Sequence, residues 1–297
     1  MFQTNKQRTY LKDLVATQCV LAPCVYDCMS ARIAEICGYK AILLSGGEIE
    51  EAGMGLPNLG IHTIDYLVDI VYNITSTCSL PLSVDMDNGF GEPLAVYRNC
   101  DRLIRAGASA IQLEDKACEG AAKLLPRKDF IAKIRAAVAA CEGTNCIVIA
   151  RNHVNVAEDF EESVARALES LEAGAHMTLC LPRNMEQAKA IAERVPGWKM
   201  FPDIGYANGA PTASVPELEK LGYNFVTMHF FLKSAINGML RDGRENLKNL
   251  NNAYTCEQEI DGIYGASGMP FWNAQEFLDF EATFTGEKKI WKGAAPR

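Results

Sequence analysis

Short apolar runs alternate along most of the chain with longer segments in which apolar residues recur every three or four positions. The short runs are typical of buried strands, and the longer segments are typical of helices that bury one face. Several of the longer segments are followed by glycine, as at Gly38, Gly107, Gly174 and Gly222. Glycine commonly ends a helix because it adopts left-handed backbone angles without strain. The pattern therefore predicts strands and helices in alternation.

Eight strand–helix units are predicted in this way, after an N-terminal helix within residues 1–18. The strands are expected over residues 20–26, 41–44, 81–84, 110–113, 146–150, 177–181, 199–202 and 225–228. The helices are expected over residues 30–37, 64–77, 94–105, 128–141, 159–173, 185–194, 215–221 and 231–250. Eight units in series predict an α/β fold, a parallel (β/α)8 TIM barrel. A doubly wound open sheet is the alternative, but neither G-x-G-x-x-G nor a Walker A loop occurs.

The last part of the chain does not continue this pattern. We expect residues 1–250 to form the barrel with its N-terminal helix, and residues 251–297 to form a C-terminal helical extension. Residues 274–282 could form one more helix, with Phe277, Leu278 and Phe280 as its apolar side chains. A detached apolar helix must be buried, either on its own barrel or on a neighbouring subunit.

Composition excludes several classes of protein. The 297 residues are 48% hydrophobic and 22% charged, as in a globular enzyme with a large core. A net charge of -8 without a basic stripe argues against nucleic acid as a partner, and no long apolar run predicts a membrane span or a signal peptide. Eleven cysteines without a C-x-x-C pair predict a cytoplasmic protein without a disulfide framework or a structural zinc site.

The segment PLSVDMDNGFG, residues 81–91, contains the first candidate for chemistry. Asp85 and Asp87 follow a short apolar strand, and carboxylates two apart on a strand share one face. Gly89 and Gly91 permit a tight turn. The pair suits a hard cation such as Mg²⁺, whereas the alternative is an acidic, glycine-rich turn without a ligand.

Polar residues also follow the other predicted strands, where barrel enzymes carry their chemistry. The strand ends are Asp27, Ser45-Gly46-Gly47, Asp85 with Asp87, Glu114-Asp115-Lys116, Arg151-Asn152-His153, Asp203 and His229. We expect the carboxylates to bind a divalent cation, and Ser45 with the backbone N–H groups of Gly46 and Gly47 to hold an anionic group. Arg151 can contact a carboxylate through two N–H groups. The set suits a small acid chelated to Mg²⁺.

Several of these residues have an ordinary structural interpretation. Asp27 could cap the following helix, and Arg151 could form a structural ion pair. His153 and His229 are more often loop or core histidines than catalysts, so neither is placed among the first candidates. Cys118 could be a reactive thiol, although nothing in the sequence indicates a lowered pKa for it.

With these motifs in order, the chain resembles the isocitrate lyase/phosphoenolpyruvate mutase superfamily. The matching segments are YDCMSAR (26–32), LSGG (44–47), GLPNLG (55–60), DMDNGFG (85–91), LEDK (113–116) and IAR (149–151). They cover roughly residues 20 to 245 in the same order, and the D-x-D-x-G-[FY]-G and E-D-[KQ] motifs are specific.

The resemblance implies a barrel whose last helix is swapped with a partner subunit, in a homotetramer built of dimers. It implies Mg²⁺, with Mn²⁺ as a possible substitute, around Asp85, Asp87 and Glu114, partly through water. It implies that Ser45, Gly46, Gly47 and Arg151 bind a carboxylate or phosphonate of the substrate, and we expect Asp27 to contribute as well. Members act on small 2-oxo or 2-hydroxy acids through an enolate.

Two departures from the family pattern limit the choice of reaction. The lyase branch carries a catalytic cysteine in a K-[KR]-C-G-H loop, whereas this chain reads KACEGAAKLLPRKDF, residues 116–130, with Cys118 not at the corresponding place. The mutase and hydrolase branch has an aspartate where this chain has Asn58, and a bulky aromatic where it has Leu44. Decarboxylation requires only the metal and an electron sink, so it tolerates these losses best.

The favoured interpretation is a Mg²⁺-dependent carbon–carbon lyase or decarboxylase acting on a small 2-oxo or 2-hydroxy di- or tricarboxylate through a metal-stabilised enolate. Ser45 and Arg151 would fix a carboxylate, and Asn58 would orient the reacting group. A phosphonate enzyme, either phosphoenolpyruvate phosphonomutase or phosphonopyruvate hydrolase, is the alternative. A barrel that binds an acid without converting it is a third interpretation.

Overall fold

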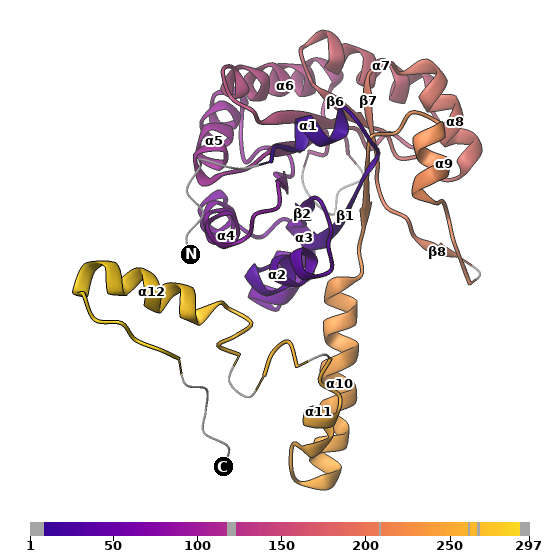
Figure 1. Ribbon diagram of the computed structural model, residues 1–297. Helices are drawn as coiled ribbons and strands as arrows, with labels where there is room; N and C mark the ends of the chain where they lie inside the picture. The colour runs from indigo at the N-terminus through magenta and orange to yellow at the C-terminus, as the bar shows by residue number, and fades with distance from the viewer. Residues whose placement is uncertain (1–8, 118–122, 208, 261, 266–267, 292–297) are drawn as a thin grey trace. The chain divides into compact units, whose positions relative to one another are not determined.

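Eight parallel strands close into a barrel, as predicted, in the computed structural model (Figure 1). The structure describes residues 9–117, 123–207, 209–260, 262–265 and 268–291. The order around the barrel is β1-β10-β7-β6-β5-β4-β3-β2, and β2 pairs with β1 to close it. The barrel strands are β1 (Val20–Val25), β2 (Ile42–Leu44), β3 (Leu82–Asp85), β4 (Ala110–Glu114), β5 (Ile147–Arg151), β6 (Met177–Leu179), β7 (Trp198–Phe201) and β10 (Phe225–Met228).

Helices follow the strands as the periodicity predicts. They are α1 (Leu11–Val15), α2 (Cys28–Ile36), α3 (Gly46–Ile49), α4 (Ile64–Thr77), α5 (Pro93–Ala106), α6 (Arg127–Cys141), α7 (Phe160–Glu172), α8 (Met185–Arg194), α9 (Val215–Lys220), α10 (Phe231–Asn249), α11 (Ala253–Glu257) and α12 (Ala274–Thr285). The predicted N-terminal helix is shorter than expected, since α1 has five residues and residues 1–8 lie outside the described part.

Four short elements escape the sequence pattern. After β2 the chain enters α3 and then the π-helix η2 (Glu50–Met54), where we expected a glycine turn. A small antiparallel pair, β8 (Tyr206–Ala207) and β9 (Ala210–Pro211), lies in the segment after β7. Segments this short are below the length at which apolar periodicity is informative.

The register of the sheet brings specific polar residues side by side. Asp85 on β3 is paired with Gln112 on β4, and Glu114 at the end of β4 is paired with Arg151 at the end of β5. The apolar residues of the same strands, such as Val84, Ile111 and Val148, are fully buried. A packed core therefore fixes the positions of the polar strand ends.

The chain divides into two compact units, Gln3–Leu232 and Lys233–Arg297. In this division α10 belongs almost entirely to the second unit, and the functional boundary expected at residue 250 stays a prediction. Phe231 and Leu232 are the buried residues of α10, and the residues after them are half-buried or exposed. The start of α10 therefore belongs to the barrel's core through Phe231 and Leu232, whereas the rest of the helix buries no residue.

No helix in the described ranges is long and apolar enough to cross a membrane. The ten cysteines within those ranges are all free, and six of them are buried. Cys118 lies outside the described residues.

Candidate functional site

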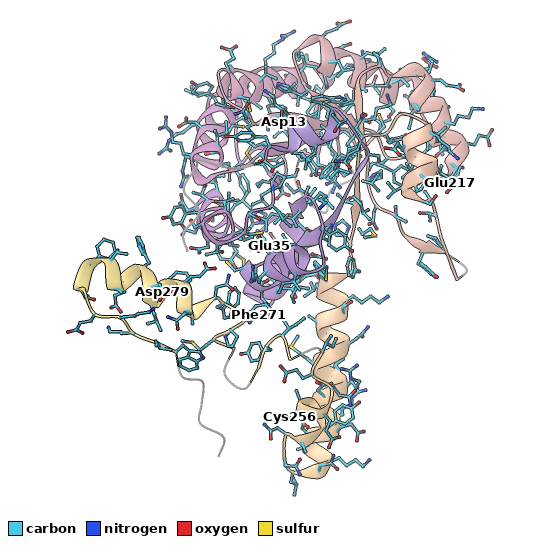
Figure 2. The ribbon with its side chains drawn as sticks, viewed as in Figure 1. Asp13, Glu35, Glu217, Cys256, Phe271 and Asp279 are labelled. Carbon is cyan, nitrogen blue, oxygen red and sulfur yellow. The ribbon has the colours of Figure 1, made fainter. Side chains whose placement is uncertain are left out.

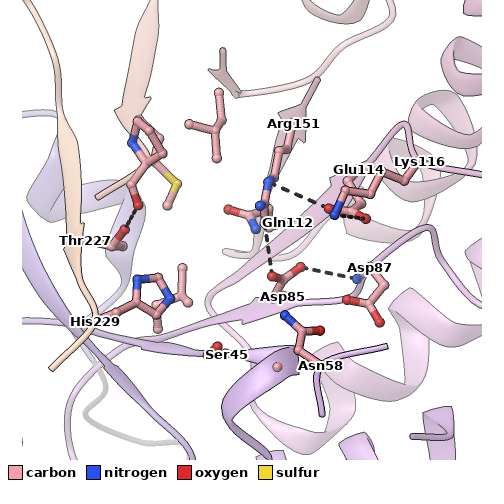
Figure 3. Close-up of a pocket in the computed structure, with 15 residues that line it drawn as sticks. Ser45, Asn58, Asp85, Asp87, Gln112, Glu114, Lys116, Arg151, Thr227 and His229 are labelled. Atoms are coloured by element: carbon pink, nitrogen blue, oxygen red, sulfur yellow. Dashed lines mark hydrogen bonds and ion pairs between the residues drawn. The ribbon is translucent and has the colours of Figure 1, made fainter. Parts of the chain in front are cut away.

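A cavity of about 110 Å³ lies at the carboxyl ends of the barrel strands (Figure 3). It is lined by Leu43, Ser45, Gly47, Asn58, Asp85, Asp87, Gln112, Glu114, Lys116, Arg151, Leu179, Met200, Pro202, Thr227 and His229. Most predicted site residues are among them, because parallel strands direct their carboxyl ends to one edge of the barrel.

The segment after β3 holds Asp85 and Asp87 in different ways. Asp85 is the last residue of β3, and its Oδ1 accepts a hydrogen bond from the backbone N–H of Asp87 at 3.3 Å. Asp87 has a positive φ of 45°, which is uncommon for residues other than glycine. A Cβ on Gly46 would lie 3.0 Å from Oδ1 of Asp87, so glycine at this position gives the carboxylate its room.

Arg151 lies between two of the carboxylates. Its Nη1 is 3.2 Å from Oδ2 of Asp85, and its Nε is 3.7 Å from Oε2 of Glu114. Nζ of Lys116 is 3.9 Å from the other oxygen of Glu114. The cavity therefore combines several carboxylates with two cations, a set that can bind both a cation and an anionic substrate.

His153 orients Glu114, a role that we did not predict. Nε2 of His153 is 2.6 Å from Oε2 of Glu114, and the backbone N–H of His153 donates to Asp115 at 2.8 Å. Burial, with the charges of Arg151 and Lys116, lowers the pKa of His153 to about 3. The ring is therefore neutral at physiological pH and can donate its Nε2–H to Glu114. In the sequence, the position of His153 two residues after Arg151 was the feature that pointed to this role.

Ser45 is the N-cap of α3, and its Oγ accepts from the backbone N–H of Glu48 at 3.3 Å. The predicted anion-binding turn is thus the first turn of a short helix. Gly47 lines the cavity, and a Cβ there would lie 2.4 Å from Nδ2 of Asn58. Gly46 is buried and packs against Asp87 and His62, so it is not one of the lining residues.

Asp27 has the structural role that we considered as its alternative. Its carboxylate accepts from the backbone N–H of Ser30 at 2.7 Å and closes a capping box at the start of α2. It lines a separate cavity of about 200 Å³ with Tyr26, Tyr66 and other residues. Neither Asp27 nor Gly46 lines the cavity at the strand ends.

A sequence profile of the family described as phosphoenolpyruvate phosphomutase matches residues 11–247. The chain belongs to this family. A 2-methylisocitrate lyase of Aeropyrum pernix is 31% identical over 272 residues, which cover 88% of this chain and 84% of the relative. An oxaloacetate decarboxylase of Paraburkholderia xenovorans is 32% identical over 200 residues, covering 65% and 67%. The resemblance drawn from the motifs and the assignment to the lyases of this superfamily are thereby confirmed.

Solved structures agree with the fold. A phosphonopyruvate hydrolase in complex with oxalate and Mg²⁺ superposes with a TM-score of 0.80 at 23% identity, covering 93% of this chain and 98% of that one. At 23% identity, this superposition shows a shared barrel fold and does not show a shared reaction.

The cavity of this family member suits a hard cation of the Mg²⁺ or Mn²⁺ type. Among the described residues, no three His, Cys, Asp or Glu side chains stand close enough together to enclose a metal ion. Mg²⁺ keeps several water ligands and is commonly held by one or two carboxylates, so an open set such as Asp85, Asp87 and Glu114 fits it. Oε1 of Gln112, a buried acceptor lining the cavity, has no hydrogen-bond partner and could bond to such a water.

Behind Asp87 lies a buried pair that sequence analysis missed. Nδ1 of His62 is 2.8 Å from Oε1 of Glu50, and both side chains are essentially inaccessible. Glu50 also accepts hydrogen bonds from the backbone N–H groups of Leu59 and His62. Burial would raise the pKa of Glu50, but these hydrogen bonds outweigh it, so the pKa is lowered. Nε2 of His62 is 3.7 Å from Oδ2 of Asp87 and has no hydrogen-bond partner. This buried pair lies behind the predicted metal site, on the protein side of Asp87.

Proposed function

We propose that this protein is a divalent-cation-dependent carbon–carbon lyase or decarboxylase that acts on a small 2-oxo or 2-hydroxy di- or tricarboxylate. The observation that carries the proposal is the cavity itself, in which the guanidinium of Arg151 lies beside Asp85 and Glu114, while Asp87 lines the same cavity. The relatives named 2-methylisocitrate lyase and oxaloacetate decarboxylase support this substrate class.

Asp85, Asp87 and Glu114 would hold Mg²⁺ or Mn²⁺, directly or through water. When bound, such a cation would polarise the keto or hydroxyl oxygen of the substrate and stabilise developing negative charge. His153 would keep Glu114 in place through its short contact.

The substrate carboxylate would be bound by Arg151, Ser45 and the backbone at Gly47. Arg151 presents its donors into the cavity, and its Nε is buried without a hydrogen-bond partner. A carboxylate from the substrate would satisfy that donor. Asn58, which lines the same cavity, would orient the reacting group by hydrogen bonding, since an amide can donate and accept but cannot take up charge.

The test is a screen for pyruvate release in the presence of Mg²⁺, with and without EDTA. The substrates are oxaloacetate, methylisocitrate, dimethylmalate and phosphonopyruvate. Because Mg²⁺ alone decarboxylates oxaloacetate slowly, each rate is corrected with the same concentration of the Asp85→Ala variant. We expect EDTA-sensitive pyruvate from at least one of the three carbon acids.

Other outcomes contradict the proposal in distinct ways. Pyruvate and phosphate from phosphonopyruvate alone would assign the protein to the phosphonate enzymes. No product from any of the four acids would support a binding protein, and Asn58→Asp would then test whether a carboxylate restores activity.

A further inference from the structure

One buried residue, Glu50, is bonded to both ends of the segment that carries Asn58. Glu50 stands where α3 passes into η2, and its side chain is fully buried. Its backbone carbonyl accepts the N–H of Leu56 at 3.2 Å. Its carboxylate accepts the N–H of Leu59 at 2.8 Å and the N–H of His62 at 2.9 Å. Asn58 therefore lies between two points at which the chain is fastened to Glu50.

The segment of residues 55–62 buries little apolar surface of its own. Within this range, all of which the structure describes, His62 alone is buried, whereas Leu59 and Ile61 are 51% and 48% exposed. The N–H of Ile61 is a further donor to the Glu50 carboxylate. Hydrogen bonds to an ionised acceptor are stronger than those between neutral groups, so these bonds, rather than apolar packing, fix the place of Asn58.

His62 extends this connection to the turn after β3. Nδ1 of its ring is 2.8 Å from Oε1 of Glu50, and because a carboxylate only accepts, Nδ1 carries the hydrogen of this contact. The ring also meets the turn after β3 in two places. Nε2 is 3.7 Å from Oδ2 of Asp87 and has no hydrogen-bond partner. The ring packs edge-to-face on Phe90, with centroids 5.3 Å apart.

The first turn of α3 brings Asp87 and Asn58 against adjacent positions. A Cβ on Gly46 would lie 3.0 Å from Oδ1 of Asp87 and 3.5 Å from the His62 ring. A Cβ on Gly47 would lie 2.4 Å from Nδ2 of Asn58. In Figure 3 the side chains of Asp87 and Asn58 lie on the same side of the cavity. A displacement of either side chain therefore disturbs the short helix against which the other packs.

We propose that Glu50 and His62 form a buried link that positions Asp87 and the Asn58 segment together, so that a cation bound at Asp87 also fixes Asn58 beside the substrate. This inference rests on the proposed function. Neither Glu50 nor His62 lines the cavity, so both are positioning residues. Coupling of this kind is reciprocal: a cation that restrains Asp87 should restrain residues 55–62, and loosening that segment should weaken cation binding by the same factor.

The first test measures Mn²⁺ binding to the full-length protein by electron paramagnetic resonance, without substrate. His62→Asn keeps an amide near Glu50 but none near Asp87, whereas the longer His62→Gln side chain places an N–H near Asp87. Both variants lose the ring contact with Phe90. We expect the dissociation constant of His62→Asn to rise about 10- to 100-fold, as when a group that supports a metal ligand is removed. His62→Gln should recover most of this loss.

The Mn²⁺ titrations separate this inference from the proposed function. Equal losses in the two variants would reduce His62 to a packing role and overturn the link, as would a His62→Asn dissociation constant within about twofold of the wild type. A wild type that binds no Mn²⁺ would instead refute the cation site itself. Circular dichroism checks that each variant is folded.

The second test measures amide hydrogen exchange of residues 55–62 by mass spectrometry, with and without Mg²⁺, and its first arm uses the unaltered protein. Mg²⁺ should slow exchange in this segment, although none of its residues is a proposed cation ligand. Glu50→Gln should raise the exchange rate without Mg²⁺ at least about tenfold, because a neutral amide replaces a charged acceptor, and should abolish the effect of Mg²⁺. Glu51→Gln, the same change at the exposed neighbouring position, is the matched control.

Exchange in the wild type that saturating Mg²⁺ leaves unchanged would overturn the link. An effect of Mg²⁺ that survives in Glu50→Gln would likewise remove Glu50 from it. Neither measurement depends on turnover, so failure of the link and failure of the lyase assignment in the pyruvate screen are distinguishable.

Discussion

At the residue scale, the cavity depends on how carboxylates are balanced by cations. Asp85 contacts Arg151 directly, whereas Asp87 is held on a left-handed backbone turn beside Gly46 and His62. The two aspartates, two positions apart, therefore have different surroundings. The carboxylate of Asp85 would bind the proposed cation, and its contact with Arg151 orients that guanidinium.

We predict that Asp85→Ala abolishes cation-dependent activity, by roughly three orders of magnitude or more, with the fold retained. The lost carboxylate removes a cation ligand and leaves Arg151 without its nearest partner. Steady-state rates with Mg²⁺, Mn²⁺ binding and circular dichroism provide the measurements. Asp69→Ala, an exposed change on α4, is the control. An Asp85→Ala protein that keeps normal activity would refute the metal assignment.

Gly47→Ala tests the positioning of Asn58. The added Cβ would lie 2.4 Å from Nδ2 of Asn58, so the amide must move away. Displacements of about 1 Å near reacting groups can reduce rates by about 100-fold, and we expect kcat to fall more than KM changes. Gly143→Ala is the control, since a Cβ there meets nothing within 4 Å, although its positive φ costs some stability. Unchanged kcat in Gly47→Ala would remove Asn58 from the proposed mechanism.

At the scale of elements, the end of β4 is fastened to α7 by a buried ion pair. Nη1 of Arg166 is 2.9 Å from Oδ2 of Asp115, and Asp115 also accepts the backbone N–H of His153. Asp115 is fully buried and Arg166 nearly so. The pair thus links β4, α7 and the segment after β5, and it holds neighbouring Glu114 and His153 in the positions that the cavity needs.

Arg166→Met is predicted to lower the free energy of unfolding by about 3 kcal/mol, because it leaves the Asp115 charge buried without its cation. Denaturant unfolding measures the change. Arg194→Met is the control, since Arg194 pairs with Glu161 in an exposed setting and should cost below about 1 kcal/mol. If the two variants lost equal stability, the Asp115–Arg166 pair would have no special structural role.

At the scale of the whole molecule, the second unit leaves many apolar side chains exposed. They include Met239, Leu240, Leu247, Phe280 and Phe284. Phe271, labelled in Figure 2, is buried, but α12 has no buried residue within the described part. Exposed apolar surface of this extent is typical of an interface. We therefore propose that this unit packs on a second copy of the chain, in a dimer or a dimer of dimers.

Replacing Phe280 and Phe284 by glutamate should weaken that assembly. The two rings contact each other, with centroids 4.9 Å apart, and charges there oppose burial at an interface. Light scattering after size-exclusion chromatography should show the wild type as an oligomer and the double variant shifted toward the mass of one chain. Glu281→Gln and Glu287→Gln together form a control on exposed positions of the same region. A monomeric wild type would contradict the proposal.

The barrel and the identity of its acidic strand ends could be predicted from the amino-acid sequence. Strand alternation and helical periodicity are local properties, so all eight barrel strands were predicted to within a few residues. Asp85, Asp87, Glu114 and Arg151 could be grouped because parallel strands end at one edge. Short elements such as α3 and η2 carried too few residues to show a period.

Which strand-end groups face the cavity, and which have another role, depends on contacts made in the folded chain. Asp27 caps a helix, and Gly46 packs against Asp87, although both stand at strand ends. His153 meets Glu114 across two strands, and His229 meets Asp203 across two others. These contacts depend on barrel closure and on register, which join residues far apart in sequence. A local pattern contains no information about such distances, so these contacts became visible only in the folded chain.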